Sequence, residues 1–443
     1  MTERDRWRDE LDPSVFTQVD YIVSAFDHEG IKIGVEPADG GLGYMYREDQ
    51  LLVREQYLGR VLDILGLPDE IELMQNEPGR VQRVIAGVVL LTTLRQTPES
   101  EQPFVPDVLT QIEDNLGGGI AMPNHVLTVA GTSGGCPATD PQEVYYGTEP
   151  FPSVCQDGGG SGVLIYMADT GLLADSASHS WLVGVTGDPD PGDGTLPIPP
   201  YTGHGTFVAG VARCMAPAAD VIVTNAFAIA GSTLEADLVP RLVAALGLGV
   251  DIFHLTIACP TRNDLPLIAF EAWLRLLGQY KGVACIVAAG NSGSRQPSWP
   301  AAFSEVVSVG ALAGDWRSRA SFSNYGGWVD VYAPGRDLVN AYATGTYTCQ
   351  AYPYKGDTRN FYGMAKWSGT SFSTPIVTGL IAARMSRTGE NARQAAAAVL
   401  AEAREQAIPG IGPVLLPCCH DHHRCARPSG CCCGTHHHHP HDC

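Results

Sequence analysis

Four polar residues, Asp169, His204, Asn291 and Ser371, lie at the predicted ends of strands or starts of helices, where catalytic side chains are commonly found. Asp169 and Asn291 each follow an apolar run typical of a strand buried on both faces, and open α/β sheets build their sites at the carboxyl ends of such strands. His204 and Ser371 each precede small and apolar residues typical of a packed helix. A serine hydroxyl is a weak nucleophile without a base, and a neutral imidazole is the base that works near neutral pH. The residue types are therefore those of nucleophilic catalysis.

Each of the four has a simpler explanation when it is taken alone. Asp169 fits a turn or a helix cap, His204 a satisfied structural histidine, and Asn291 a turn. Ser371 fits an ordinary helix N-cap, with Pro375 in the first helical turn, although backbone N–H groups at a helix start would also face a developing oxyanion. The order Asp, His, Asn, Ser, at separations of 35, 87 and 80 residues, favours the catalytic interpretation of the set.

Six short motifs then carry a family resemblance. They are D-T-G (169–171), G-H-G-T-F-V-A-G (203–210), A-A-G-N (288–291), A-S-F-S-N-Y-G (320–326), Y-A-P-G (332–335) and G-T-S-F-S-T-P-I-V-T-G (369–379). In this order they resemble the subtilisin-like serine peptidases, peptidase family S8, from residue 163 to about residue 400. The resemblance implies a serine endopeptidase that hydrolyses peptide bonds through an Asp-His-Ser triad and an acyl-enzyme intermediate.

The resemblance also implies a role for each residue. Ser371 is the nucleophile, His204 takes its proton and later protonates the leaving amine, and Asp169 orients the imidazole and stabilises its charged form. The Asn291 amide and the Ser371 backbone N–H would form the oxyanion hole. No cofactor is expected to be needed for catalysis.

Substrate is expected to pair with a short strand. By resemblance, Thr256, Ile257 and Ala258 correspond to a Ser-Leu-Gly stretch in the family, and Gly290 is expected beside them. Ala258 in place of glycine adds a methyl group where the substrate backbone should lie close. The chain is therefore expected to differ from its relatives in cleft width and subsite preference.

The elements that position these residues follow from the apolar pattern. Residues 163–416 alternate apolar runs with helical patterns, which predicts an α/β domain with a mainly parallel sheet, and the resemblance makes it a three-layer α/β/α peptidase domain. The expected strands are Val163–Ala168, Val221–Val223, Ile252–Ile257, Val283–Ala289 and Val306–Val309, and the expected helices include Leu234–Leu246 and Leu267–Leu277.

Residues 45–131 have an order of their own. Strand patterns at Gln50–Val53, Val84–Thr92 and His125–Ala130 alternate with helical faces at Leu58–Leu65 and Val108–Leu116, and Glu70–Met74 is a weakly marked further strand. This order predicts a small ferredoxin-like α+β domain.

A Gly-, Pro- and Ser-rich stretch, 132–162, follows this domain and is predicted to be a linker, and residues 1–44 are assigned to an N-terminal extension. A small α/β domain just before a linker resembles the propeptide inhibitor of subtilisins, which would bind the catalytic cleft intramolecularly. A permanent accessory domain is the alternative.

Composition limits the partners. The chain has 443 residues, 44% of them hydrophobic, and a net charge of −20, so wholesale disorder is excluded and an acidic surface would repel nucleic acid. The longest apolar run, Val84–Leu94, is too short to span a bilayer, and the charged N-terminal residues lack the apolar segment of a secretory signal. We therefore expect a cytoplasmic monomer that acts on polypeptides and binds neither membrane nor nucleic acid.

Residues 417–443 form a tail that contains seven of the thirteen Cys and eight of the thirteen His. With so few aliphatic residues it is expected to be disordered without metal, and its spacing fits loose binding of zinc or another transition metal better than a zinc finger. The candidate ligands are Cys418, Cys419, His420, His422, His423, Cys425, Cys431, Cys432 and Cys433. A biased extension without function is the alternative.

The family also binds structural calcium. Only the acidic run 188–194 is a candidate for such a site, and a solvated loop explains that run as well.

Two other functions stay open. One is a dedicated protease that matures a peptide precursor. The other is a non-catalytic binding protein that keeps the subtilisin fold and carries a metal-binding tail. The presence of all four catalytic residue types favours an enzyme over the binding protein.

Overall fold

A computed structural model describes residues 7–38, 41–93, 105–129 and 138–417. Apart from Pro417, the predicted metal-binding tail lies outside these residues. Within them, none of the helices is both long and apolar enough to cross a membrane.

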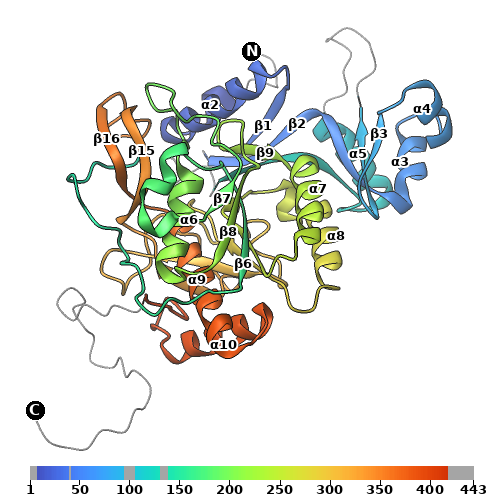
Figure 1. The fold of residues 1–443 in the computed structure, drawn as a ribbon. Coiled ribbons are helices and arrows are strands. Elements are labelled where there is room, and N and C mark those ends of the chain that lie inside the picture. Colours follow the sequence, from blue (N-terminus) through green and yellow to red (C-terminus); the bar gives the residue numbers. More distant parts are fainter. Residues whose placement is uncertain (1–6, 39–40, 94–104, 130–137, 418–443) are drawn as a thin grey trace, which may run out of the picture.

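A parallel sheet forms the centre of the larger domain (Figure 1). Its strand order is β14-β13-β12-β10-β6-β8-β7, and neighbouring strands pair in parallel. The strands are β6 (Leu164–Asp169), β7 (Thr186–Gly187), β8 (Asp220–Asn225), β10 (Ile252–Leu255), β12 (Ala284–Ala288), β13 (Val307–Leu312) and β14 (Val331–Pro334). The predicted parallel sheet is confirmed, because the continuous apolar runs do form strands that are buried on both faces.

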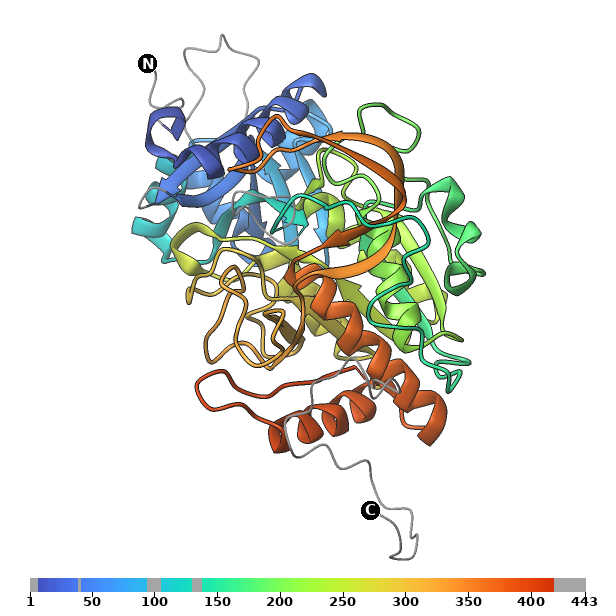
Figure 2. The ribbon, with the colours of Figure 1, turned by 90° about the vertical axis from the view of Figure 1, so that its left-hand side faces the viewer.

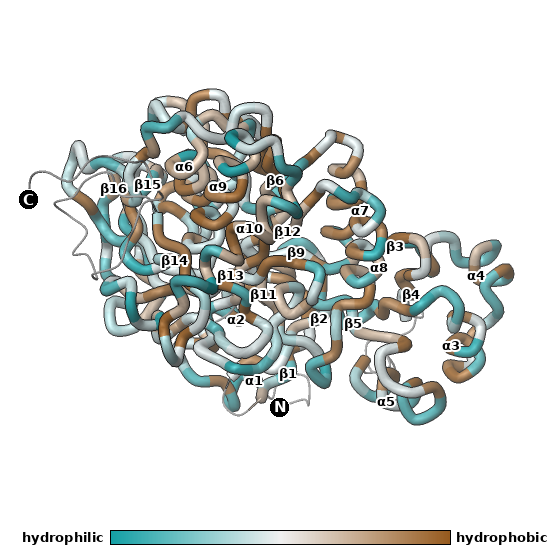
Figure 3. Tube along the Cα trace, turned by 90° about the horizontal axis from the view of Figure 1, so that it is seen from below, coloured by the Kyte–Doolittle hydropathy of each residue, from teal (hydrophilic) through white to brown (hydrophobic). Residues whose placement is uncertain are grey.

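Helices cover both faces of this sheet. Helices α6 (His204–Met215), α9 (Thr370–Thr388) and α10 (Ala392–Glu405) share one apolar core with the strands, and α7 (Glu235–Ala245) and α8 (Ile268–Leu277) share the other. Figure 3 shows the apolar segments of α9 and the strands gathered in the interior. The three-layer α/β/α architecture is therefore confirmed.

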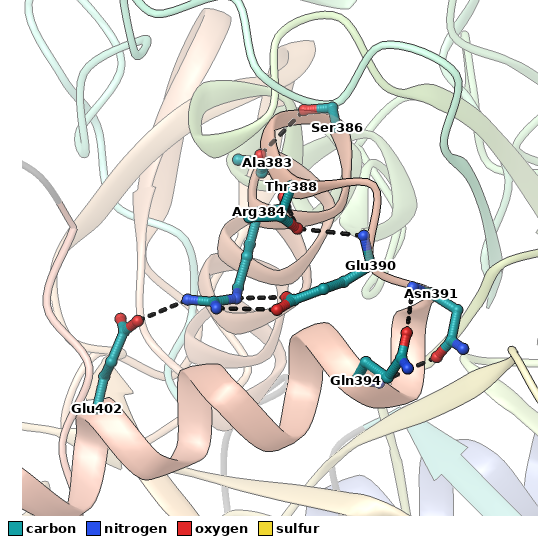
Figure 4. Close-up of polar contacts among 8 residues, drawn as sticks. All are labelled: Ala383, Arg384, Ser386, Thr388, Glu390, Asn391, Gln394 and Glu402. Atoms are coloured by element: carbon teal, nitrogen blue, oxygen red, sulfur yellow. Dashed lines mark hydrogen bonds and ion pairs between the residues drawn. The ribbon is translucent and has the colours of Figure 1, made fainter.

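The end of α9 is fixed to α10 by charged and capping groups (Figure 4). The Arg384 guanidinium donates to both carboxylate oxygens of Glu390, at 2.6 and 3.1 Å, and to Glu402 at 2.7 Å. Asn391 and Gln394 form a capping box at the start of α10. These contacts hold the far end of the helix that carries Ser371.

The N-terminal part of the chain contains an antiparallel sheet in the order β5-β2-β4-β3. Its elements are β2 (Gly41–Arg54), α3 (Leu58–Ile64), α4 (Glu70–Asn76), β3 (Val81–Ile85), β4 (Val88–Thr92), α5 (Val105–Leu116) and β5 (Ala121–Val129). Numbered along the chain, the four strands lie in the spatial order 4-1-3-2, which is the ferredoxin-like arrangement that the sequence predicts.

Some local predictions are wrong. Glu70–Met74 is helical, because Asp69 caps α4 by accepting a hydrogen bond from the Glu72 N–H at 2.9 Å. The run Val84–Thr92 is split between two strands, because Gly87, with φ +90°, makes a turn between β3 and β4. In addition, Pro375 lies in the second turn of α9 and not in the first.

Five further elements precede or flank these domains. Helices α1 (Trp7–Glu10) and α2 (Pro13–His28) and strand β1 (Ile33–Ala38), which pairs with β2, come from the predicted N-terminal extension. A hairpin of β15 (Leu338–Thr348) and β16 (Thr358–Trp367) leads into α9 and reaches toward α2 (Figure 2).

Residues 138–162 lie against the larger domain. Gln142 pairs with Lys366 of β16, Phe151 pairs with Val339 of β15, and the Cys155 N–H donates to the Cys214 carbonyl at 2.7 Å. The domain boundaries drawn from the sequence stay predictions.

Candidate active site

The end of β6 and the start of α6 place a carboxylate and an imidazole side by side. Asp169 is the last residue of β6, His204 is the first of α6, and His204 Nδ1 lies 2.7 Å from Asp169 Oδ1. Gly205 permits this approach, since a Cβ there would lie 2.5 Å from the Gly171 carbonyl oxygen. The glycine that follows the histidine is therefore a steric requirement of the site.

Asp169 is fully buried and has three polar partners. Besides His204, the Thr170 N–H donates to Oδ1 at 2.8 Å and Thr256 Oγ1 donates to Oδ2 at 2.6 Å. Burial alone would raise the pKa of Asp169, but the charge of His204 and the hydrogen bonds from His204, Thr256 and Thr170 lower this pKa below its ordinary value. The carboxylate is thus held ionised beside the imidazole.

Ser371 is the second residue of α9, and both Ser371 Oγ and His204 Nε2 are buried without a hydrogen-bond partner among the described residues. Phe372, the next residue, packs on the His204 ring at a centroid distance of 5.4 Å, and Trp367 contacts the same ring edge-on at 5.7 Å. The imidazole is therefore bonded at Nδ1 and packed against two aromatic rings, one of them from the residue that follows Ser371.

Asn291 reaches the same helix start through Thr370. Asn291 Oδ1 accepts hydrogen bonds from Thr370 N at 2.8 Å and from Thr370 Oγ1 at 3.0 Å. Thr370 Oγ1 in turn accepts from the Gly290 N–H at 3.1 Å. Sequence reasoning missed Thr370, although its position directly before Ser371 was a signal that could have identified it.

The predicted substrate strand is occupied by the N-terminal part of the chain itself. Strand β11 (Ile257–Ala258) pairs antiparallel with β5, with Val129 opposite Ile257 and Thr128 opposite Ala258. On its other side β5 pairs with β9 (Ser232–Leu234), and the Val129 N–H donates to the Gly231 carbonyl at 2.9 Å. Strand β9 could not be predicted from the sequence, because a three-residue strand is too short to show a hydrophobic period.

Of the predicted substrate residues, Thr256 lies beside Asp169, and Ala258 lies beside Gly290. The Thr256 side chain bonds to Asp169, so this residue belongs to the surroundings of the carboxylate. Ala258 lies beside Gly290, where an added Cβ would be 2.9 Å from the Ala258 methyl carbon. The alanine methyl group therefore occupies space between these two segments that a glycine would leave empty.

No group of three or more His, Cys, Asp or Glu side chains in the described part of the chain is arranged to hold a metal ion. In the acidic run 188–194, Asp190 accepts from Thr170 Oγ1 and from the N–H groups of Gly192 and Gly203. Asp188 and Asp193 also accept from backbone N–H groups. These carboxylates therefore accept hydrogen bonds from groups of the protein itself, mostly backbone N–H groups of the surrounding loops. The nine candidate ligands of the tail, Cys418 to Cys433, lie outside the described residues.

Comparisons with known proteins identify similar chains. Residues 160–410, more than half of the chain, match the model of the Subtilase family, Peptidase_S8. The thermophilic serine proteinase of Bacillus sp. (strain AK1) is 32% identical over 252 residues, which cover 53% of this chain and 54% of that protein. Thermitase of Thermoactinomyces vulgaris is 30% identical over 250 residues, 53% of this chain and 80% of thermitase. A cold adapted subtilisin-like serine proteinase of solved structure aligns over 59% of this chain and 91% of its own, with 23% identity and a TM-score of 0.44.

The chain spans about half the length of the Bacillus relative and of the M-protease of Shouchella clausii (strain KSM-K16), 54% of each. The matched residues include Asp169, His204, Asn291 and Ser371, in the order that the motifs predict. With the buried Asp169–His204 pair beside the start of α9, the family match shows that this chain belongs to the subtilase family.

Proposed function

We propose that this chain is a serine endopeptidase that cleaves polypeptides through Ser371, His204 and Asp169. The observation that carries the proposal is the 2.7 Å bond between His204 Nδ1 and Asp169 Oδ1. Among the described residues, the opposite ring nitrogen and the Ser371 hydroxyl are both buried without a hydrogen-bond partner. An oriented imidazole whose second nitrogen is available beside a serine is the arrangement of a general base and its nucleophile.

The chemistry then follows in two halves. Ser371 Oγ attacks the peptide carbonyl carbon while His204 Nε2 accepts the hydroxyl proton, and the ionised Asp169 stabilises the imidazolium that results. The oxygen that becomes negative is to be met by the Ser371 N–H at the start of α9 and by the Asn291 amide. His204 then gives the proton to the leaving amine, and water, deprotonated by the same imidazole, hydrolyses the acyl-enzyme.

A fluorophosphonate probe tests this proposal. The chain should be labelled at Ser371, and Ser371→Ala should abolish both labelling and cleavage of a peptide library while the circular dichroism spectrum stays unchanged. His204→Ala should lose activity by a comparable factor, because the two residues act as one unit. A wild-type chain that neither reacts nor cleaves would favour the binding-protein alternative.

We also propose that the N-terminal domain inhibits the enzyme by filling its cleft. Strand β5 pairs with β11, which lies in the stretch expected to bind substrate, and with β9 on its other side. Its register on β11 takes it toward Thr256, whose hydroxyl bonds to Asp169. The Thr128 and Val129 pairings on β11 use the backbone groups that a substrate would need.

Polar contacts hold this domain in place around Arg262, which follows β11. The guanidinium of Arg262 donates to both carboxylate oxygens of Glu113, at 3.2 and 3.0 Å, and to Thr110 Oγ1 at 3.0 Å. A second pair, Arg54 with Glu271 at 2.6 Å, crosses the same interface. Bidentate arginine–carboxylate pairs fix orientation as well as adding affinity, which suits an inhibitor that must present one strand in register.

The N-terminal extension adds contacts at two edges of the site. Gln18 of α2 donates to the hydroxyl of Tyr201, whose carbonyl accepts from the His204 N–H at 3.1 Å. Thr17, also on α2, accepts from Lys355 near the tip of the β15–β16 hairpin at 2.7 Å. Helix α2 thus bridges the loop before His204 and the hairpin that leads to Ser371, which supports a role for the extension in the inhibited state.

Self-cleavage tests the inhibitor proposal. Wild-type protein should cut itself on the carboxyl side of Val129, as judged by N-terminal sequencing, and the Ser371→Ala chain should stay intact. The separated N-terminal fragment, added back at micromolar concentration, should inhibit the mature enzyme. If it does not inhibit, the domain is a permanent accessory domain.

For the tail we propose loose binding of zinc or another transition metal by the Cys and His residues of 417–443, in a role separate from catalysis. The support is the chemistry of the donors, since thiolates and imidazoles prefer such ions. Zinc retained after dialysis should be lower in a chain that ends at Pro417, with peptidase activity unchanged. Equal zinc in both chains would remove the tail as a metal site.

A further inference from the structure

A second buried histidine lies behind the Asp169–His204 pair. His254 of β10 is fully buried, and it stands two residues before Thr256, whose hydroxyl bonds to Asp169. Strand β10 pairs with β6, so that His254 is opposite Met167, two residues before Asp169. The proposed mechanism gives this histidine no task.

The imidazole of His254 reaches the helix of the nucleophile. Its Nδ1 lies 2.8 Å from Thr378 Oγ1 of α9, and both groups are completely buried. Thr378 follows Ser371 by seven residues, which is about two helical turns, so the two side chains are on the same face of α9. The contact therefore links the Ser371 face of α9 to strand β10. Thr256, which follows this strand, bonds to the Asp169 carboxylate.

We propose that His254 is a positioning residue, which through Thr378 fixes the depth and rotation of α9 so that Ser371 Oγ meets His204 Nε2. This inference rests on the proposed peptidase function. His254 extends from β10 to the nucleophile helix, and Thr256, just after the end of this strand, extends to the carboxylate. Strand β10 and its continuation thus set the two ends of the triad relative to each other.

A neutral imidazole suits this task. Burial is the main cause that lowers the pKa of His254, to about 3, with the charge of His204 acting in the same direction and that of Asp169 opposing it. The bond to Thr378 is therefore made by an uncharged ring, and no positive charge is added next to His204 when that residue becomes an imidazolium.

Two disruptive variants and two conservative ones test the proposal. His254→Leu and Thr378→Val remove the bond at similar volume, whereas His254→Asn keeps a polar group close to the position of Nδ1 and Thr378→Ser keeps the hydroxyl. We expect the first two to lower kcat by about tenfold or more with KM within about twofold, because a small misplacement of a nucleophile is costly. The conservative pair should stay close to wild type.

The double variant and a control separate positioning from stability. His254→Leu combined with Thr378→Val should cost no more than either change alone, since both break one contact. Phe253→Leu, on the same strand but packed in the opposite core, should lower Tm without lowering kcat. Unchanged kcat in the two disruptive variants, or an equal loss of kcat in Phe253→Leu, would overturn the proposal. A wild-type chain that does not react with fluorophosphonate would instead refute the peptidase function itself.

Discussion

Thr128 of β5 lies directly opposite Ala258 of β11, and its hydroxyl donates to the Ala258 carbonyl at 3.4 Å. One strand of the N-terminal domain therefore uses the backbone that the family resemblance assigns to substrate. Strand β11 directly follows Thr256, whose hydroxyl bonds to Asp169, so the part of the chain proposed to restrain the enzyme lies next to the group that supports this carboxylate.

Arg262→Ala should weaken the hold of the N-terminal domain. The substitution leaves Glu113 without its bidentate partner at an interface where both side chains are mostly buried. We expect inhibition by the added N-terminal fragment to weaken by about tenfold or more. The inhibition constant against a fluorogenic peptide measures this. Arg275→Ala, whose partner Glu271 keeps Arg54, is the matched control and should leave the constant unchanged.

Thr256→Val should lower kcat by about tenfold, because a hydrogen bond to a charged group contributes roughly 1.5–3 kcal/mol and here helps to keep Asp169 ionised. Steady-state kinetics on a peptide substrate provide the measurement. Thr256→Ser retains the hydroxyl and should retain most of the activity. Equal activity of the valine and serine variants would exclude a role for the Thr256–Asp169 bond.

Asn291→Asp separates the two functions of this side chain. The aspartate can still accept from Thr370 N and Oγ1, but it has no amide N–H to offer to an oxyanion. Loss of one such donor is expected to lower kcat by about 10²–10³-fold with little change in KM. If the aspartate variant stayed active while Asn291→Ala did not, anchoring of Thr370 would be the function of Asn291 instead.

The acid stability of the protein should depend on His254. Its pKa is about 3 in the folded chain and about 6.5 in an unfolded one, so between these values the unfolded state binds a proton that the folded state does not. The free energy of unfolding should consequently fall as pH drops through this window, by up to about 1.4 kcal/mol per pH unit from this group. His254→Asn should lose less stability than wild type between about pH 6 and pH 4 in urea unfolding. Parallel losses in both proteins would contradict this assignment.

The amino-acid sequence determined the elements whose patterns are local. Continuous apolar runs predicted the parallel strands, and the strand and helix periods predicted the ferredoxin-like order. Both signals are local, because burial on one or two faces determines the hydrophobic pattern of neighbouring residues. The Glu70–Met74 prediction failed because a single cap outweighed a weak pattern. The motifs also supplied the residue types and the order of Asp169, His204 and Ser371.

Which distant groups come into contact depends on how the sheets and helices pack. The Thr256–Asp169 bond spans 87 positions, the His254–Thr378 bond spans 124, and the pairing of Thr128 with Ala258 spans 130. None of these contacts has a local period, since each depends on how sheets and helices pack after they have formed. The motifs thus predicted the catalytic chemistry, whereas packing determined which side chains surround Asp169 and which strand pairs with β11.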